Sequence, residues 1–258
     1  MKINSFFFSP LEQFEVLPII PLYFNGIDFS ITNETIVLCI LFFIFNILFT
    51  SCKNIKDSTL NLIPNKFQIL FESIYKVILS LVVDNLGKEK GQTFFPILFS
   101  TFFFVVSLNL IGLIPYSFTL TSHLIVTFTL ALFIFLALNI ICIRTHGLAF
   151  FSLFLPSGTS FFLALLLVPI ELISYVFKPI SLSIRLFANM MAGHTLLKVI
   201  AGFGWVLSSC SGILFLIHYV PLLILLPLFG LELGVALIQS FVFVILICIY
   251  LNDAINLH

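Results

Sequence analysis

The stretch 178-KPISLSIRLFANMMAGHTLLK-198 decides the fold, because it sets one arginine in the middle of a long apolar run. The neighbours of Arg185 are apolar or small on both sides, and Asn189 follows it by one helical turn. A charged side chain near the centre of a bilayer costs about 2.5–3.5 kcal/mol on insertion scales, and such residues usually mark an ion path. The rest of the chain is therefore interpreted as a scaffold that holds this arginine at membrane depth.

The composition excludes an ordinary soluble domain. Of 258 residues, 61% are apolar and 9% are charged, whereas soluble domains carry about 25% charged residues. The apolar runs are long and continuous and do not alternate at period two, which favours helices over a β-barrel. We therefore predict an all-α polytopic membrane protein, one membrane domain over residues 1–258, with about five membrane-embedded helices and one interfacial amphipathic helix.

Charge and cysteine usage narrow the possible functions. The formal net charge is zero, so the chain has no basic footprint for nucleic acid. The five cysteines are scattered, without the spacing of a metal site or a disulfide framework. We expect no cofactor, no metal and no nucleic acid.

The first third of the chain combines an arm, a span and a surface helix. We expect residues 1–31 to be an N-terminal arm and residues 32–50 to be the first span, with Asn33 as its N-cap. Residues 64–86 show helical period, with a polar stripe formed by Glu72, Lys76, Ser80 and Asp84. That pattern predicts an amphipathic helix on the membrane surface. The alternative is a marginal spanning helix.

The remaining apolar stretches predict a hairpin and two long segments, at residues 93–114, 122–143, 157–203 and 212–251. Each of the last two could reach roughly 60 Å, about twice the ~30 Å hydrocarbon core. Both are interrupted by prolines, so each is either two helices or one long, steeply tilted helix. The lysine-rich loop after the first span predicts that the N-terminus lies outside and the C-terminus inside.

The scarce polar residues of the last two segments have an informative spacing. Glu171 precedes Arg185 by about 21 Å along a helix and about 40° from its face, whereas His194 follows on the opposite face. Glu232 and Gln239 are seven residues apart and share a face. Carboxylates and imidazoles can exchange protons, whereas arginine stays charged and can only act as a fixed cation.

Each of these residues also has a plainer structural interpretation. Arg185 could form a structural ion pair with Glu171 or Glu232, and His194 could be an ordinary hydrogen-bonded helix residue. Lys178 and Lys198 lie nearer the ends of their segment, where they can snorkel to the interface. The combination of residues is more informative than any one of them.

The run PISLSIRLFANMMAGH, with Glu232 and Gln239 in LELGVALIQS and Asn109 in SLNLIGLIPY, resembles subunit a of the F-type ATP synthase. The pairing of His194 with Glu232 resembles the mitochondrial branch. The resemblance covers the chain from about DNLGKEKGQTFFP to Asp253. It implies a non-catalytic stator subunit whose two long, tilted helices wrap a ring of c-subunits, and whose two half-channels carry protons to and from the ring carboxylates.

The resemblance also implies a role for each site residue. Arg185 would face the ring carboxylates and prevent leakage. The entry half-channel would be lined by Asn109, Asn189, His194, Glu232 and Gln239. Glu171 and Asp253 would line the exit. The partners implied are the c-ring, other stator and peripheral-stalk subunits and lipid, in the mitochondrial inner membrane, with the N-terminus in the intermembrane space and the C-terminus towards the matrix.

Other functions fit the sequence less well. A redox-linked respiratory-chain subunit that binds haem would need paired histidines on facing helices, and the five histidines here lack such a spacing. A secondary transporter would show internal repeats, and an intramembrane hydrolase would show HExxH or GxSxG; the sequence has none of these patterns. The residues alone do not distinguish protons from sodium ions.

Overall fold

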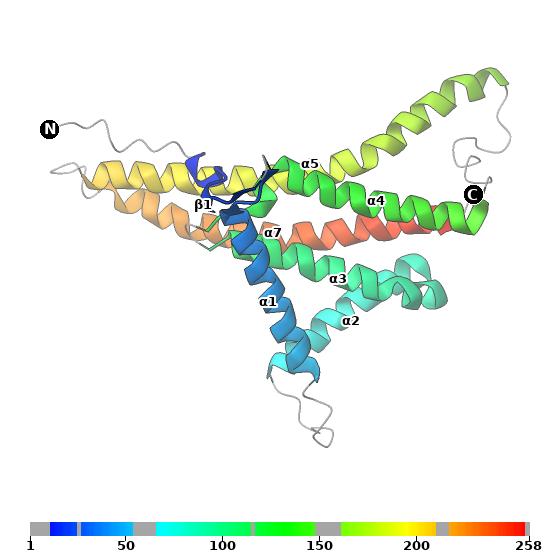
Figure 1. The fold of residues 1–258 in the computed structure, drawn as a ribbon, viewed down its shortest axis with the longest axis horizontal. Coiled ribbons are helices and arrows are strands. Elements are labelled where there is room, and N and C mark those ends of the chain that lie inside the picture. The colour runs from blue at the N-terminus through cyan, green and yellow to red at the C-terminus, as the bar shows by residue number, and fades with distance from the viewer. Residues whose placement is uncertain are drawn as a thin grey trace. The chain divides into compact units, whose positions relative to one another are not determined.

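A computed structural model describes residues 11–24, 27–53, 66–114, 117–147, 161–209 and 217–255 (Figure 1). Its helices are α1 (Asn33–Lys53), α2 (Lys66–Leu86), α3 (Lys88–Gly112), α4 (Leu124–His146), α5 (Phe161–Ser208) and α7 (Tyr219–Ile255). In the described part of the chain, α3, α4, α5 and α7 are long and apolar enough to cross a membrane. The predicted all-α polytopic fold is confirmed.

The two long apolar segments are each one continuous helix, drawn in Figure 1 as uninterrupted ribbons. Helix α5 has 48 residues with Pro169 and Pro179 inside it, and α7 has 37 residues with Pro227 inside it. In an apolar environment every freed backbone group must find a partner, which favours continuing a helix past a proline over breaking it. At about 1.5 Å per residue α5 is about 72 Å long. Its steep tilt in a membrane remains a prediction.

Helix α3 begins at Lys88, earlier than the expected start at residue 93. The two helices α2 and α3 are separated only by Gly87, whose φ of 80° lies in the left-handed region. Its backbone N–H donates to the carbonyl of Val83 at 2.9 Å. A left-handed glycine ends one helix at once, and Glu89 then lies in the favoured acidic position of the next first turn.

The chain folds as two compact units. The first comprises Met1–Pro64, Val106–His123 and Ala188–Leu237, and the second comprises Asn65–Val105, Leu124–Phe187 and Ile238–His258. Helices α3, α5 and α7 therefore contribute residues to both.

The second unit contains the main hydrophobic core. Helix α2 buries Ile78 and Val82 in it, and α7 buries Phe243, Val244 and Leu251. The polar stripe of α2 lies on the exposed side, where Lys76 Nζ is 3.0 Å from Glu72 Oε1. The amphipathic pattern of α2 thus corresponds to one packed face and one solvated face.

The first unit contains the N-terminal arm, whose described part forms short regular elements. A short helical turn, η2 (Glu12–Phe14), is followed by β1 (Pro18–Ile20), β2 (Tyr23–Phe24), β3 (Ile27–Asp28) and β4 (Ile31–Thr32). Strand β1 pairs antiparallel with β4, and β2 with β3. The arm is thus a nested hairpin that leads into α1.

Asn33 joins this arm to the start of α1. Its Oδ1 accepts from the N–H of Glu34 at 3.1 Å and from the N–H of Leu17 at 3.2 Å. Its Nδ2 donates to the carbonyl of Glu15 at 3.0 Å. A typical N-cap accepts from the second or third N–H of its helix, so the side chain predicted to cap α1 serves mainly to fasten the arm.

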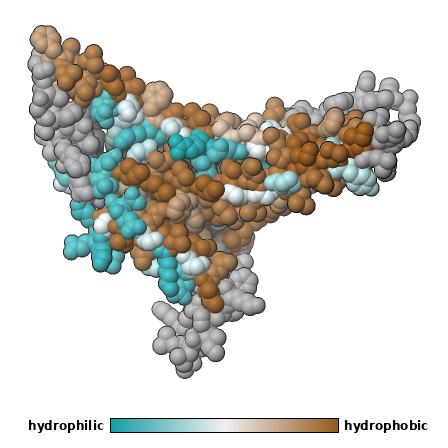
Figure 2. All heavy atoms as spheres, turned by 180° about the vertical axis from the view of Figure 1, so that it is seen from behind, coloured by the Kyte–Doolittle hydropathy of each residue, from teal (hydrophilic) through white to brown (hydrophobic). Residues whose placement is uncertain are grey.

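Much of the molecular surface is apolar. Figure 2 shows hydrophobic side chains over much of the face in view, and Phe162, Ile125 and Leu226 are 87%, 78% and 77% exposed. Exposed apolar patches of this kind mark surfaces that contact a membrane or a partner.

Candidate functional site

Arg185 lies on the outer side of α5, in the second unit. Its neighbours Leu182, Ser183 and Leu186 are buried, whereas Arg185 itself is exposed. Among the described residues no carboxylate lies within salt-bridge distance of its guanidinium. Among the described residues of its unit, then, the arginine has no ion pair, and its side chain is exposed on an apolar helix.

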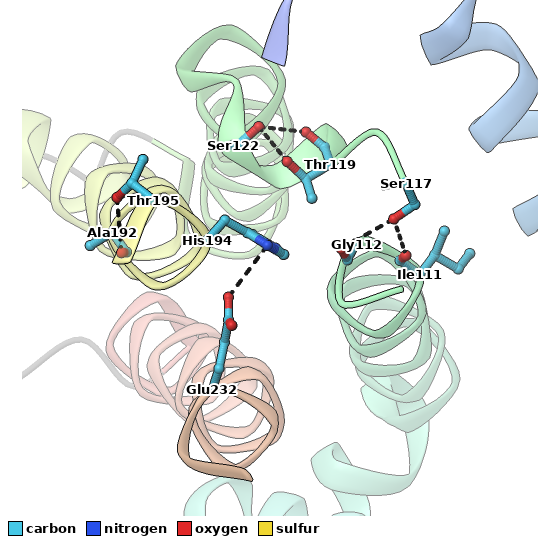
Figure 3. A network of polar contacts seen from close by, with 9 residues as sticks. All are labelled: Ile111, Gly112, Ser117, Thr119, Ser122, Ala192, His194, Thr195 and Glu232. Carbon is cyan, nitrogen blue, oxygen red and sulfur yellow. Dashed lines mark hydrogen bonds and ion pairs between the residues drawn. The ribbon is translucent and has the colours of Figure 1, made fainter. Parts of the chain in front are cut away.

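His194 and Glu232 meet in the first unit, one from α5 and one from α7 (Figure 3). The imidazole Nδ1 lies 3.6 Å from the carboxylate Oε1, and the two side chains are only 12% and 5% exposed. Such a pair is an ion pair only when the imidazole is protonated. Two proton-exchanging groups are thus held side by side and away from bulk water.

Gly193 makes this approach possible. A Cβ at that position would lie 2.7 Å from Glu232 Oε1 and 3.0 Å from its carboxyl carbon. Real Cβ atoms essentially never come so close, so the carboxylate occupies space that any larger residue at position 193 would take. The glycine beside His194 therefore sets the position of Glu232.

Asn109 joins the same region from α3. Its side chain is fully buried, and its Nδ2 donates to the carbonyl of Ala236, one turn beyond Glu232 on α7, at 3.3 Å. Leu113, Met190 and Ala236 form a small apolar cluster that packs the three helices together. The buried amide is thus fixed beside the helix that carries the carboxylate.

Several buried polar atoms of this region lack a hydrogen-bond partner among the described residues. They are Asn109 Oδ1, Thr121 Oγ1, His194 Nε2 and both carboxylate oxygens of Glu232. Buried polar atoms are usually satisfied, and when no protein atom serves, ordered water does. The chemistry of these atoms therefore suits a path of water molecules.

The connection between α3 and α4 brings further hydroxyl groups near His194 (Figure 3). Thr119 Oγ1 donates to Ser122 Oγ at 2.6 Å, and Ser122 in turn donates to the carbonyl of Thr119. The ideal Cβ position of Gly112 lies 3.8 Å from His194 Nε2 and 3.0 Å from Thr119 Cγ2. The imidazole therefore has the carboxylate at Nδ1 and the end of α3 at Nε2.

A second polar cluster lies in the second unit. Lys178 Nζ is 3.8 Å from Asp253 Oδ2, and it also lies over the rings of Tyr250 and Tyr175 at 4.8 and 5.2 Å. The Tyr175 hydroxyl donates to Asn139 Oδ1 on α4. A small pocket is lined by Tyr175, Lys178, Tyr250 and Asp253, together with Phe135 and Leu138 of α4. A partly exposed cation thus accompanies Asp253.

The other predicted site residues lie on α5 and α7 and are divided between the two units. Glu171 is exposed on α5, with no salt bridge to a described residue, and Asn189 is half-buried. Gln239 is 4% exposed and lies in the second unit, whereas Glu232 lies in the first. Asn109, His194 and Glu232 of the predicted set form a local group in the first unit.

The ATP synthase A chain family model matches residues 34–252. The chain belongs to the ATP synthase A chain family. One relative is ATP synthase subunit a of Chondrus crispus, 49% identical over 258 residues, which cover all of both chains. Another is ATP synthase subunit a of Pylaiella littoralis, 52% identical over 98% of this chain and 100% of the relative. ATP synthase subunit a-2 of Arabidopsis thaliana is 48% identical over 97% of this chain and 72% of the relative.

In this member of the ATP synthase A chain family, sequence reasoning missed two contacts. The first is the contact of Lys178 with Asp253, since the sequence suggested only that Lys178 snorkels to the interface. A lysine within an apolar run and an aspartate near the end of the last helix were the signals that could have suggested it. Sequence reasoning also gave the arm no role, yet Phe14 packs edge-on against His194, with ring centroids 6.5 Å apart. Nothing in the local sequence around Phe14 signals that contact.

Proposed function

We propose that this chain is the proton-translocating stator subunit of the membrane sector of an ATP synthase. It is a non-catalytic subunit that works beside a ring of c-subunits and is held by other stator and peripheral-stalk subunits. The observation that carries the proposal is an exposed Arg185 that forms no ion pair with any residue the structure describes, in a chain of the ATP synthase A chain family. A permanent cation on an apolar surface needs an anion from another molecule.

Proton entry uses the buried pair of His194 and Glu232. The two groups lie 3.6 Å apart and are largely hidden, and water beside the unpartnered atoms of Asn109 and His194 would connect them to the aqueous phase. A proton passed along this path neutralises a ring carboxylate. The neutral carboxyl can then face lipid at far lower cost than the anion.

Arg185 acts at the other end of the cycle. When a protonated ring carboxyl returns to it, the fixed positive charge favours the carboxylate and drives proton release. Because arginine does not itself give up a proton, it also blocks direct passage between the two half-channels. The transmembrane potential supplies about 2.3 kcal/mol per charge per 100 mV, in addition to the pH difference.

Proton exit uses the second cluster. Asp253 lies near the C-terminal end of α7, 48% exposed, with Lys178 beside it. Glu171 lies on the exposed side of α5. Carboxylates that are partly in contact with water can take a proton and release it to the solvent. We place this exit on the matrix side of the mitochondrial inner membrane, following the lysine-based orientation.

The proposal is tested by substituting Arg185 in the assembled ATP synthase. ATP synthesis is then measured in vesicles under an imposed proton gradient. Arg185→Ala is expected to abolish coupled synthesis, because nothing then drives release or prevents leakage. The matched control is Lys198→Ala, which removes another lone cation of α5 and is expected to leave synthesis near the wild-type rate. Normal synthesis by the Arg185→Ala complex would contradict the proposal.

A further inference from the structure

The N-terminal arm reaches the functional site through a single aromatic side chain. Phe14 ends the turn η2 and is only 8% exposed, although much of the arm around it is exposed. Its ring meets the imidazole of His194 edge-on, at an interplanar angle of 71° and a centroid distance of 6.5 Å. The contact joins residues 180 positions apart in the sequence, so the fold has to hold it in place.

The arm is fastened beside this contact. Asn33 bonds the backbone of Glu15 and Leu17, which directly follow Phe14, and its own N–H donates to the carbonyl of Leu17 at 3.2 Å. The pairing of β1 with β4 continues the attachment along the chain. Phe14 is thus held by the start of α1 and does not depend on its own packing alone.

The imidazole has a different neighbour on each side. Nδ1 points toward Glu232 at 3.6 Å, Nε2 is buried near Gly112, and Phe14 lies against the ring in a T-shaped contact. An aromatic edge against an imidazole restricts rotation of the ring and excludes water from that side. What remains open to the ring is the polar side that faces the carboxylate and the end of α3.

We propose that Phe14 is a positioning residue of the proton path. It keeps the imidazole of His194 turned toward Glu232 and shields it from bulk water on the side of the arm, and Asn33 fastens it there. The functional consequence rests on the proposed function, whereas the shielding itself is a property of the fold and can be measured without any assay of transport.

The experiment measures how fast diethyl pyrocarbonate modifies His194 in the intact, detergent-solubilised ATP synthase, resolved by peptide mass spectrometry. His146 on α4 serves as the internal reference. Phe14→Ala is expected to raise the modification rate of His194 by about fivefold or more relative to His146, because the covering group is gone. Phe14→Tyr keeps the ring and is expected to retain most of the protection.

Two further variants separate this role from a general effect on folding. Phe29→Ala removes a phenylalanine of the same arm that is 61% exposed, and it is expected to leave the modification rate of His194 unchanged. Asn33→Ala releases the arm without touching Phe14, and it is expected to raise the rate as Phe14→Ala does. Equal rates for wild type, Phe14→Ala and Asn33→Ala would overturn the proposal.

Proton transport provides the second readout. Phe14→Ala is expected to slow ATP-driven proton pumping severalfold, because a freely rotating imidazole spends less time facing Glu232, while Phe29→Ala pumps normally. If modification rises but pumping is unchanged, the shielding stands and the positioning role is refuted. If the wild-type complex does not translocate protons, the proposed function fails. A higher modification rate in Phe14→Ala would still support the shielding.

Discussion

At the scale of single residues, the absence of a side chain at Gly193 matters as much as the groups that react. Gly193→Ala puts a methyl carbon 2.7 Å from the present position of Glu232 Oε1. The carboxylate is the flexible end of its side chain, so it can move aside and the fold survives. Its distance to His194 then increases, and misplacing a reacting group by about 1 Å can cost about 100-fold in rate.

We therefore expect Gly193→Ala to assemble normally but to slow ATP-driven proton pumping by at least about tenfold. Fluorescence quenching of a pH-sensitive dye in vesicles measures the rate. Gly202→Ala is the control on the same helix, because a Cβ there meets nothing within 4 Å. Equal pumping by the two variants would show that Glu232 does not need its present position.

The pair of Lys178 and Asp253 makes a separate prediction about proton release. Their 3.8 Å contact is partly exposed, so it contributes little to stability, but it places a cation beside a carboxylate of the proposed exit. We expect Asp253→Asn and Lys178→Met each to slow ATP synthesis, and the double variant to be no slower than Asp253→Asn alone. Independent, multiplying losses would mean that the lysine does not act through the aspartate.

Residue types in an apolar chain could be recognised from the sequence, but spacing alone did not give their partners, and the pairing of His194 with Glu232 came only from the family resemblance. Arg185, Glu232 and His194 stand out because charges and imidazoles are scarce there. That His194 meets Glu232 depends on how α5 and α7 pack, and that Phe14 covers His194 depends on the path of the arm. Helical spacing relates residues within one helix only, so neither contact follows from it.

At the scale of secondary-structure elements, the junction at Gly87 separates the amphipathic helix α2 from α3, which is long and apolar enough to cross a membrane. Its φ of 80° is costly for any residue with a Cβ, by about 1–2 kcal/mol. Gly87→Ala is therefore expected to destabilise the subunit by about 1 kcal/mol, seen as a lower midpoint for thermal unfolding of this chain in the solubilised complex.

Gly91→Ala is the matched control for that junction. Gly91 lies inside α3 without a positive φ, and a Cβ there meets Val82 at an ordinary 3.5 Å. Alanine is the better helix former by about 1 kcal/mol, so the midpoint should stay or rise. A fall as large as that of Gly87→Ala would show that backbone conformation is not the cause.

The sequence predicts the end of a helix only where a glycine, a proline or a group of polar residues marks it. Gly87 and the charged residues after it indicate a boundary between two helices. They do not show that α3 starts directly at Lys88. The prolines of α5 and α7 left one helix or two as open alternatives, because a proline removes one hydrogen bond whether the helix bends or breaks. Packing of the flanking turns decides the outcome.

At the scale of the whole molecule, the described residues leave the most hydrophobic stretch of the longest helix largely exposed. The most hydrophobic 18-residue stretch of α5 is only 6% buried within the chain, against 39% for that of α7. Exposed apolar surface of this kind marks contact with lipid or a partner, and the proposed function puts a partner with an anionic group opposite the arginine. The composition predicts that the chain is a membrane protein. It does not predict which surface of a partner covers the helix, because that surface belongs to another sequence.

The central claim, an acidic ring opposite Arg185, is tested most directly by cross-linking from the next turn of α5. A cysteine introduced as Asn189→Cys in the assembled complex is expected to cross-link to a small two-helix ring subunit, identified by mass spectrometry. Phe133→Cys on α4, at a position that is 72% exposed, is the control and should give no ring product. A cysteine at 189 that reacts only with lipid-soluble reagents, and never with the ring subunit, would contradict the account.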